Sequence, residues 1–260
     1  MTEHRLPDRP EDADVTDRAE LLSLDERQGS PVGRRVFLGL VGLGAAGIVG
    51  GAALQRRVES ALAPVAAVDP TGLAANLPIG NRFRIYTVTG GFPRRTRDEY
   101  RLRVHGLVDH DLDLTYADLL AREPAHLTRD FQCVTGWRVD DVEWTGVRLA
   151  DLLDAAGVQR GATALRFGSF DGVYTESLTL DQARRDDVLV AYRMLGADIT
   201  RPHGGPVRLS VAPMYGYKSI KWLDSIEVVA DVVPGYWEQR GYDTDAWVGT
   251  SNGRDDAPIG

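Results

Sequence analysis

The sequence predicts an α+β domain with a mixed, β-rich core and short helices. Three observations support this fold class: strand-like runs outnumber helical ones, the helical patterns are brief, and strands and helices do not alternate regularly. Regular alternation would indicate a doubly wound parallel sheet, which we therefore do not expect.

The expected elements follow one another along the chain. Arg101–His105 alternates polar and apolar side chains, as a half-buried strand does. Thr115 and Asp118 have the spacing of a capping box, so a short helix is expected through Leu120. A second helix is expected where apolar residues recur at helical spacing before Gly157: Leu149, Leu152, Leu153 and Ala156. Further strands are expected at Ala164–Phe167, Tyr174–Leu178, Val188–Tyr192, Val207–Val211 and Ser225–Val229.

The net charge of -8 is concentrated at the N-terminus. Residues 1–33 carry nine acidic side chains and four arginines, which is typical of a disordered leader. The rest of the chain has no broad basic character, so we do not expect nucleic acid as a partner. A hydrophobic fraction of 43% is ordinary for a soluble globular domain.

Residues 34–57 have the pattern of a twin-arginine export signal. Arg34 and Arg35 precede an uncharged apolar run that ends before Arg56 and Arg57. The alternative is a membrane anchor formed by residues 36–54, because this run is near the length that spans a bilayer. We expect an extracytoplasmic protein, with a linker at 58–80, a catalytic domain at 81–250 and a tail at 251–260.

Cys133 is the single cysteine, so no intramolecular disulfide can form. A lone cysteine is most often a small buried hydrophobe, but Cys133 lies among polar residues and turn formers. A thiolate is also a nucleophile and a soft metal ligand. Two functional interpretations therefore stay open: a cysteine hydrolase, using His105, His126 or His203 as base, and a metal site.

Four sequence blocks carry a resemblance to a known family. They are Phe131–Trp137 with Trp144–Leu153, Leu189–Leu209, Tyr215–Leu223 and Gly235–Tyr242. Together they resemble the oxidoreductase molybdopterin-binding domain of the sulfite oxidase superfamily, over roughly residues 80–245. The version of the cysteine segment found here is similar to the bacterial periplasmic branch that includes the methionine-sulfoxide reductase catalytic subunit.

The resemblance implies a molybdenum-molybdopterin cofactor (Mo-MPT) and a set of residues that hold it. Cys133 would be the metal ligand, and Tyr174 would lie near the substrate. The implied cofactor-binding residues are Asn81, Phe83, Arg84, Ser169, His203, Arg208, Ser219, Ile220 and Lys221. A role for Lys221 would also explain why both lysines of the chain, Lys218 and Lys221, occur in one short stretch.

The same resemblance implies two-electron oxygen-atom-transfer chemistry on a small or protein-bound sulfoxide or related oxide. Sulfite oxidases carry an arginine before the first family strand, whereas residues 86–93 here contain no cation. Sulfite dehydrogenation is therefore the alternative, followed by a cysteine hydrolase and by a binding module that has lost its metal. We expect a monomeric catalytic domain without the dimerisation domain of sulfite oxidases, served by a membrane haem subunit or a soluble electron carrier.

Overall fold

The computed structural model describes residues 81–249 together with Ser30–Pro31. The expected leader, export signal or anchor, linker and tail lie outside these residues, apart from Ser30–Pro31 (β1), which pairs in parallel with β2 (Arg84–Ile85). In the part of the chain that is described, no helix is long and apolar enough to cross a membrane.

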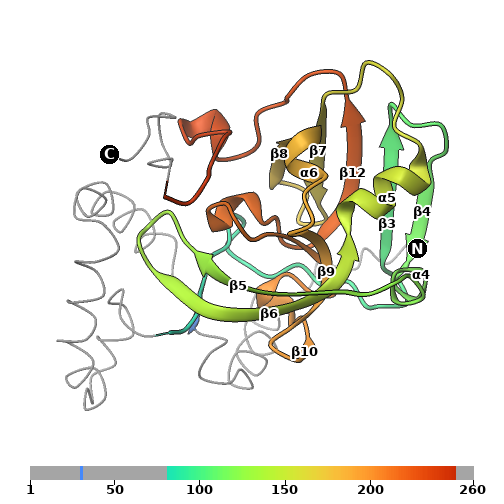
Figure 1. Cartoon of the computed structure of the whole chain (residues 1–260). Coiled ribbons are helices and arrows are strands. Elements are labelled where there is room, and N and C mark those ends of the chain that lie inside the picture. The colour runs from blue at the N-terminus through green and yellow to red at the C-terminus, as the bar shows by residue number, and fades with distance from the viewer. Residues whose placement is uncertain (1–29, 32–80, 250–260) are drawn as a thin grey trace, which may run out of the picture.

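One five-stranded sheet has the order β4-β3-β12-β7-β8. Its strands are β3 (Arg101–Gly106), β4 (Leu112–Thr115), β7 (Ala164–Ser169), β8 (Thr175–Thr179) and β12 (Leu223–Val229). The pairing of β3 with β12 is parallel and the other pairings are antiparallel. Strands distant in sequence thus lie side by side at the centre of this sheet (Figure 1).

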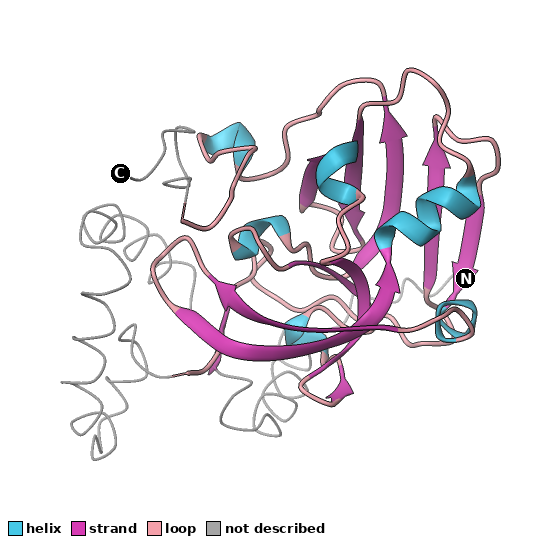
Figure 2. Ribbon diagram, viewed as in Figure 1, coloured by secondary structure: helices cyan, strands magenta, loops and turns pink. Residues whose placement is uncertain are grey.

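The second sheet is built around β9 (Val188–Met194). β9 pairs with the long strand β6 (Arg138–Arg148), which pairs in turn with β5 (Ala125–Gln132). β10 (Ala197–Asp198) and β11 (Arg208–Val211) also pair with β9. Figure 2 shows the curved β5–β6 hairpin of this sheet crossing below the first sheet. The expected α+β class, with a β-rich core, is confirmed.

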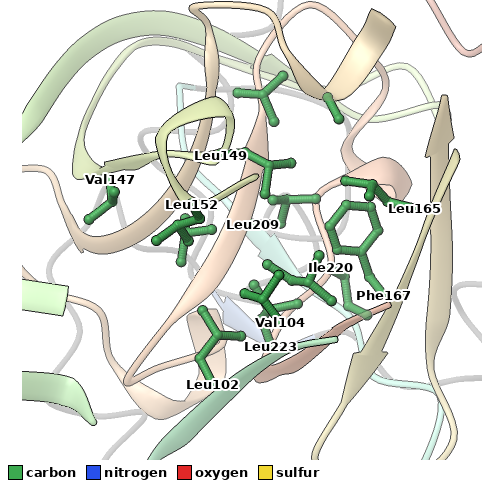
Figure 3. Close-up of a cluster of buried hydrophobic side chains, with 14 of the residues drawn as sticks. Leu102, Val104, Val147, Leu149, Leu152, Leu165, Phe167, Leu209, Ile220 and Leu223 are labelled. Atoms are coloured by element: carbon green, nitrogen blue, oxygen red, sulfur yellow. The ribbon is translucent and has the colours of Figure 1, made fainter. Parts of the chain in front are cut away.

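The main hydrophobic core joins the two sheets and the helix α5 (Leu149–Ala156). Figure 3 shows leucine, valine, isoleucine and phenylalanine side chains from β3, α5, β7, β11 and β12 converging there. β9 is buried on both faces: Val188 and Val190 enter this core, whereas Leu189 and Ala191 enter a second cluster. Each such side chain contributes roughly 1.5–3 kcal/mol on burial, which makes the two-sheet frame a firm support for the residues at its edge.

The helices are short, and those expected are present. α4 (Tyr116–Leu120) has the expected capping box between Thr115 and Asp118, and α5 ends at Gly157, whose φ is 72°. α6 (Leu180–Ala183) has a second capping box, from Thr179 to Gln182. Three single turns of 3-10 helix are η3 (Arg201–His203), η4 (Gly216–Lys218) and η5 (Glu238–Arg240).

The β5–β6 hairpin was not predicted, although it holds Cys133. Four of the eight residues of β5 are exposed and only Ala125 is buried, without clean alternation, so its sequence lacks the usual strand signal. A further difference concerns Tyr174, which was expected in a strand. It lies in the turn before β8, which begins at Thr175.

Candidate active site

Cys133 lies in the turn between β5 and β6. The Cys133 N–H donates to the Trp137 carbonyl at 2.8 Å, and the Gly136 N–H donates to the Cys133 carbonyl at 3.0 Å. Gly136 has a φ of 95°, which favours glycine at this position. The half-buried thiol is 3.2 Å from the Thr135 hydroxyl. The turn thus fixes the direction in which Sγ points.

Burial raises the pKa of the Cys133 thiol, and this effect outweighs the opposing hydrogen bonds from Thr135 and the charge of Arg84. A thiol in this state stays protonated near neutral pH. A metal ion that binds it must displace the proton, and the bound thiolate is then stabilised by the metal charge itself. The surroundings therefore suit a metal ligand better than a free nucleophile.

Cys133 opens into a cleft between the hairpin turn, β2, and the segments that follow β7 and β11. Nine of the expected site residues line it: Phe83, Arg84, Cys133, Tyr174, His203, Arg208, Ser219, Ile220 and Lys221. These residues are far apart in sequence, and the two-sheet frame brings them together.

Arg208, at the start of β11, is a buried cation held by backbone carbonyls. Its guanidinium donates to the carbonyls of His203 and Ser219, both at 2.8 Å, and to that of Leu209 at 3.3 Å. Burial lowers its pKa to about 10. No carboxylate of the described chain forms an ion pair with it, so an anion in the cleft would supply the missing counter-charge.

Lys221 gives the cleft a second such cation. Its ammonium donates to the carbonyls of Tyr86 and Pro202 and lies 4.4 Å from the centre of the Trp222 ring. Burial, followed by the charge of Arg208, lowers its pKa to about 7. Two neighbouring cations without a carboxylate between them fit the phosphate end of a pterin cofactor.

Lys218, only three residues earlier, has the opposite surroundings. Its ammonium is fully buried between Glu176, at 2.8 Å, and Glu238. The two carboxylates raise its pKa against the effect of burial. The clustering of the two lysines therefore has two causes, and only Lys221 faces the cleft.

Two expected cofactor contacts, Asn81 and Ser169, are not among the residues that line the cleft. The Asn81 side-chain oxygen accepts the Asp140 N–H at 2.6 Å, and the Ser169 hydroxyl accepts the Asp171 N–H at 3.2 Å. Both side-chain oxygens bind backbone N–H groups in this structure, and the cofactor contacts expected of these residues stay predictions.

Asp171 is a cleft residue that the sequence reasoning missed. Its Oδ1 accepts the N–H groups of Val173 and Tyr174 at 2.9 and 2.8 Å. Its Oδ2 is buried and has no hydrogen-bond partner in the described structure. This oxygen is an acceptor available to a ligand with N–H or O–H groups. Its position in a turn, two residues after the expected site residue Ser169, could have identified Asp171 from the sequence.

Tyr86 also enters the cleft without having been expected there. Its hydroxyl accepts a hydrogen bond from the Trp137 indole at 3.2 Å. Burial, followed by the nearby Cys133, raises its pKa to about 12. Arg84, two residues earlier, is buried, and burial lowers its pKa. These two side chains and Cys133 therefore share one end of the cleft.

Tyr174 faces the cleft, but its hydroxyl is already engaged. It donates to the Tyr217 carbonyl at 2.7 Å, so its proton is not available to a substrate. Burial and the neighbouring Glu176 raise its pKa well above the usual range. Its ring stacks on Tyr236 at 5.6 Å between centroids.

Further rings continue from Tyr236 along this side of the cleft. Trp237 lies 5.2 Å from both Tyr236 and Tyr242, and the Arg240 guanidinium lies 3.6 Å from the Tyr236 ring centre. We call Tyr174, Tyr236, Trp237 and Tyr242 the aromatic wall. It borders the cleft and comes from the turn before β8 and from residues 236–242.

The hydrolase alternative finds no support in this geometry. His105 contacts the Ser225 hydroxyl at 2.9 Å, and His126 contacts that of Thr145 at 3.1 Å. His203 lines the cleft, where its ring packs edge-to-face on Phe83. None of the three is within hydrogen-bond distance of the thiol, whose partner is Thr135.

Residues 81–249 contain no group of three or more His, Cys, Asp or Glu side chains placed to hold a metal ion. Cys133 is the thiol that lines the cleft, so a metal that brings further ligands with it fits this site. A dithiolene cofactor with an anionic phosphate end meets this need and matches the Arg208–Lys221 pair.

Comparison with known proteins agrees with this chemistry. The oxidoreductase molybdopterin binding domain matches residues 89–237, which is more than half of the chain. "Uncharacterized oxidoreductase YuiH" of Bacillus subtilis is 38% identical over 145 residues, covering 55% of this chain and 72% of that protein. Sulfite oxidase of Arabidopsis thaliana is 32% identical over 177 residues, covering 55% of this chain and 45% of that protein.

A solved structure shares the fold. It is the sulfane dehydrogenase SoxCD from Paracoccus pantotrophus, with a TM-score of 0.52 and 25% identity over 55% of this chain and 41% of that one. The chain thus spans less than half the length of both the plant sulfite oxidase and the SoxCD chain.

The chain belongs to the oxidoreductase molybdopterin-binding domain family, within the sulfite oxidase superfamily. It is a molybdenum-dependent oxidoreductase, and its cofactor is molybdenum-molybdopterin. A place in the methionine-sulfoxide reductase branch stays a prediction.

Proposed function

We propose that this protein reduces an uncharged oxide, a small or protein-bound sulfoxide or a related N-oxide, by two electrons. The balanced reaction takes the sulfoxide, two protons and two electrons to the thioether and water. The observation that carries the proposal is the make-up of the cleft beside Cys133. The aromatic wall forms one side of this cleft, and the uncharged Thr87 and Val88 line another part of it. The cations that line the cleft are Arg84, Arg208, Lys221 and Arg240.

Each of four cleft residues would have its own role in holding the cofactor. Cys133 would bind the metal, and Arg208 and Lys221 would bind the phosphate of the pterin. Asp171 would accept a hydrogen bond from an N–H group of the cofactor. When bound, the cofactor supplies two-electron redox chemistry, while the protein supplies ligation, orientation and electrostatics. Ser219 and Ile220 line the cleft, and the Ser219 carbonyl orients Arg208.

The aromatic wall would bind the substrate. Rings exclude water and accept the apolar substituents of a thioether, whereas they offer little to a dianion. Tyr174 contributes its ring face, and its oxygen can accept but not donate a hydrogen bond while it is bound to Tyr217.

Sulfite dehydrogenation is the second candidate, and Arg84 favours it. The charge of this arginine acts on the Cys133 thiol, which puts a cation near the reacting end of the cleft. The similarity to plant sulfite oxidase points the same way.

The test uses full-length protein made in a molybdopterin-competent host, with metal analysis and pterin fluorescence to confirm loading. Reduction of methionine sulfoxide, dimethyl sulfoxide and trimethylamine N-oxide is followed with a reduced dye, and oxidation of sulfite with ferricyanide. Turnover of an oxide with sulfite inert supports the proposal. Sulfite oxidation with every oxide inert refutes it in favour of the second candidate.

The setting of the enzyme is part of the same proposal. It is exported by the twin-arginine pathway and anchored or released at residues 36–54. It acts as a monomer and receives electrons from a membrane haem subunit or a soluble carrier. Replacing Arg34 and Arg35 by lysine and fractionating the cells tests export, because the unmodified protein should leave the cytoplasm and the variant should not.

A further inference from the structure

Behind the aromatic wall lies a buried ionic cluster that the proposed reaction does not use. Glu176 of β8, Lys218 of η4 and Glu238 of η5 meet there, and all three are buried. The Lys218 ammonium donates to the Oε1 atoms of both carboxyl groups. Two buried carboxylates on one ammonium would leave a net negative charge away from water, which is costly.

The two carboxyl groups receive different numbers of hydrogen bonds. Glu238 is saturated with donors: Lys218 at Oε1, and the Ser177 hydroxyl and the Gly235 N–H at Oε2, at 2.9 and 2.6 Å. Glu176 Oε1 accepts from Lys218 and from the Ser177 N–H, both at 2.8 Å, whereas its Oε2 is buried and receives no donor. Glu176 is therefore the carboxyl whose ionised form is the less well stabilised by hydrogen bonds, and so the one of the two that favours a proton.

The cluster connects the two sides of the cleft. Glu238 belongs to the segment 235–242, which supplies Tyr236, Trp237 and Tyr242 to the aromatic wall. Lys218 directly precedes Ser219–Lys221 on the cofactor side. The Tyr236 N–H also donates to the Thr175 carbonyl at 2.9 Å, next to Glu176.

We propose that Glu176, Lys218 and Glu238 are positioning residues that latch the aromatic wall to the cofactor-binding segment while Glu176 holds a proton, and that loss of this proton loosens the wall. The groups that face Glu176 are Lys218 from η4, Glu238 from η5 and Tyr174 from the turn before β8. Burial and the neighbouring Glu176 raise the pKa of Tyr174 well above its usual range, so Tyr174 adds no charge to the latch near neutral pH.

The direction of the pH dependence follows from linkage. Burial, and then the neighbouring Glu238, raise the pKa of Glu176 from 4.5 to about 8 against the charge of Lys218. When the wall opens, Glu176 reaches water and regains its ordinary pKa. The open form therefore binds fewer protons between these values, and the latch weakens as pH rises through this window and levels off above it.

Hydrogen exchange measured by mass spectrometry on the full chain tests the latch without requiring turnover. Protection factors, corrected for the intrinsic rate, are compared for residues 234–242 at about pH 6 and about pH 8, with α5 as internal reference. In the unmodified protein we expect protection of the wall to fall about tenfold or more across this window, while α5 changes little.

Glu176→Gln is the decisive variant, because its amide mimics the protonated acid. It should fold, and its wall protection should be the same at both pH values. Glu227→Gln, at an exposed ion pair on β12, is the matched control and should behave as the unmodified protein. Glu238→Gln should lose wall protection at about pH 6 by about tenfold. Retained pH dependence in Glu176→Gln, its failure to fold, or a flat profile in the unmodified protein would each overturn the latch.

The role of the wall in substrate binding rests on the proposed function and is measured separately. With an oxide substrate, KM should rise between about pH 6 and about pH 8 in the unmodified enzyme and stay level in Glu176→Gln. If the enzyme oxidises sulfite instead, the proposed function is wrong, but the hydrogen-exchange experiment still tests whether the latch exists.

Discussion

Replacing Lys221 by methionine should stabilise the cofactor-free protein at low pH while abolishing cofactor binding. Lys221 is a half-buried cation beside Arg208, and neither of them forms an ion pair with a carboxylate of the described chain. Methionine keeps most of the length of the side chain and removes the charge. A side chain that lowers the stability of the cofactor-free protein but is needed for cofactor binding behaves as a binding residue.

The size of the effect comes from the pKa of Lys221, which is lowered from 10.5 to about 7. Between these values the unfolded chain binds the proton and the folded chain does not, so stability rises with pH in this window. From about pH 6 to about pH 9 the unmodified protein should gain up to about 3 kcal/mol relative to Lys221→Met, and about half of that after solvent screening. The hydrogen bonds that Lys221 makes to carbonyls offset part of the benefit at every pH, but not its pH dependence.

The assay is urea unfolding of protein made without molybdopterin, at about pH 6 and about pH 9. Arg103→Met removes an exposed cation from β3 and serves as control, for which we expect no pH-dependent difference. Pterin fluorescence of protein from a competent host should fall strongly in Lys221→Met only. If the stability difference between Lys221→Met and the unmodified protein does not change with pH, the assignment of a charge without a counter-ion in the cleft is refuted.

Three other predictions concern single side chains. Cys133→Ser should lose molybdenum and activity, while its free energy of unfolding stays within about 1 kcal/mol of that of the unmodified protein. Metal analysis and urea unfolding test this. Full activity of the variant would refute ligation of the metal by the thiol. Tyr174→Phe should cost about 1 kcal/mol of stability through the lost bond to the Tyr217 carbonyl, but change KM little; a large rise in KM would show that the hydroxyl contacts substrate. Gly216→Ala should lower the free energy of unfolding by about 1–3 kcal/mol, because its Cβ would lie 2.3 Å from the Phe131 ring. Gly91→Ala has open space around its Cβ and should leave the free energy of unfolding unchanged in the same urea experiment.

The sequence alone determined the fold class and the helix ends, and it predicted Cys133 as the metal ligand. Local signals suffice for these: side-chain periodicity gave β3, β7, β9 and β12, and the Thr115 capping box gave the start of α4. Cys133 was identified by its neighbours in the chain and by four family-like blocks in order. Periodicity, capping boxes and the residues within each block depend on positions close together in the chain.

Only the tertiary structure decided what surrounds each site residue. Lys218 and Lys221 have the same side chain and lie three positions apart, yet Lys218 forms ion pairs with two carboxylates and Lys221 forms none with the described residues. Lys221 donates to the carbonyl of Tyr86, which is 135 positions away in the chain. Charge and burial at a site depend on which distant segments pack together, and strand pairing sets this rather than local pattern.

The same reason explains the remaining differences. Asp171 and not Ser169 presents a polar atom to the cleft, because the turn uses the serine hydroxyl for its own backbone. The hairpin that carries Cys133 escaped prediction because β5 is an exposed strand with few apolar side chains. The sequence therefore predicted Cys133 as a ligand, whereas the fold decided its cleft, the cations in that cleft and the aromatic wall.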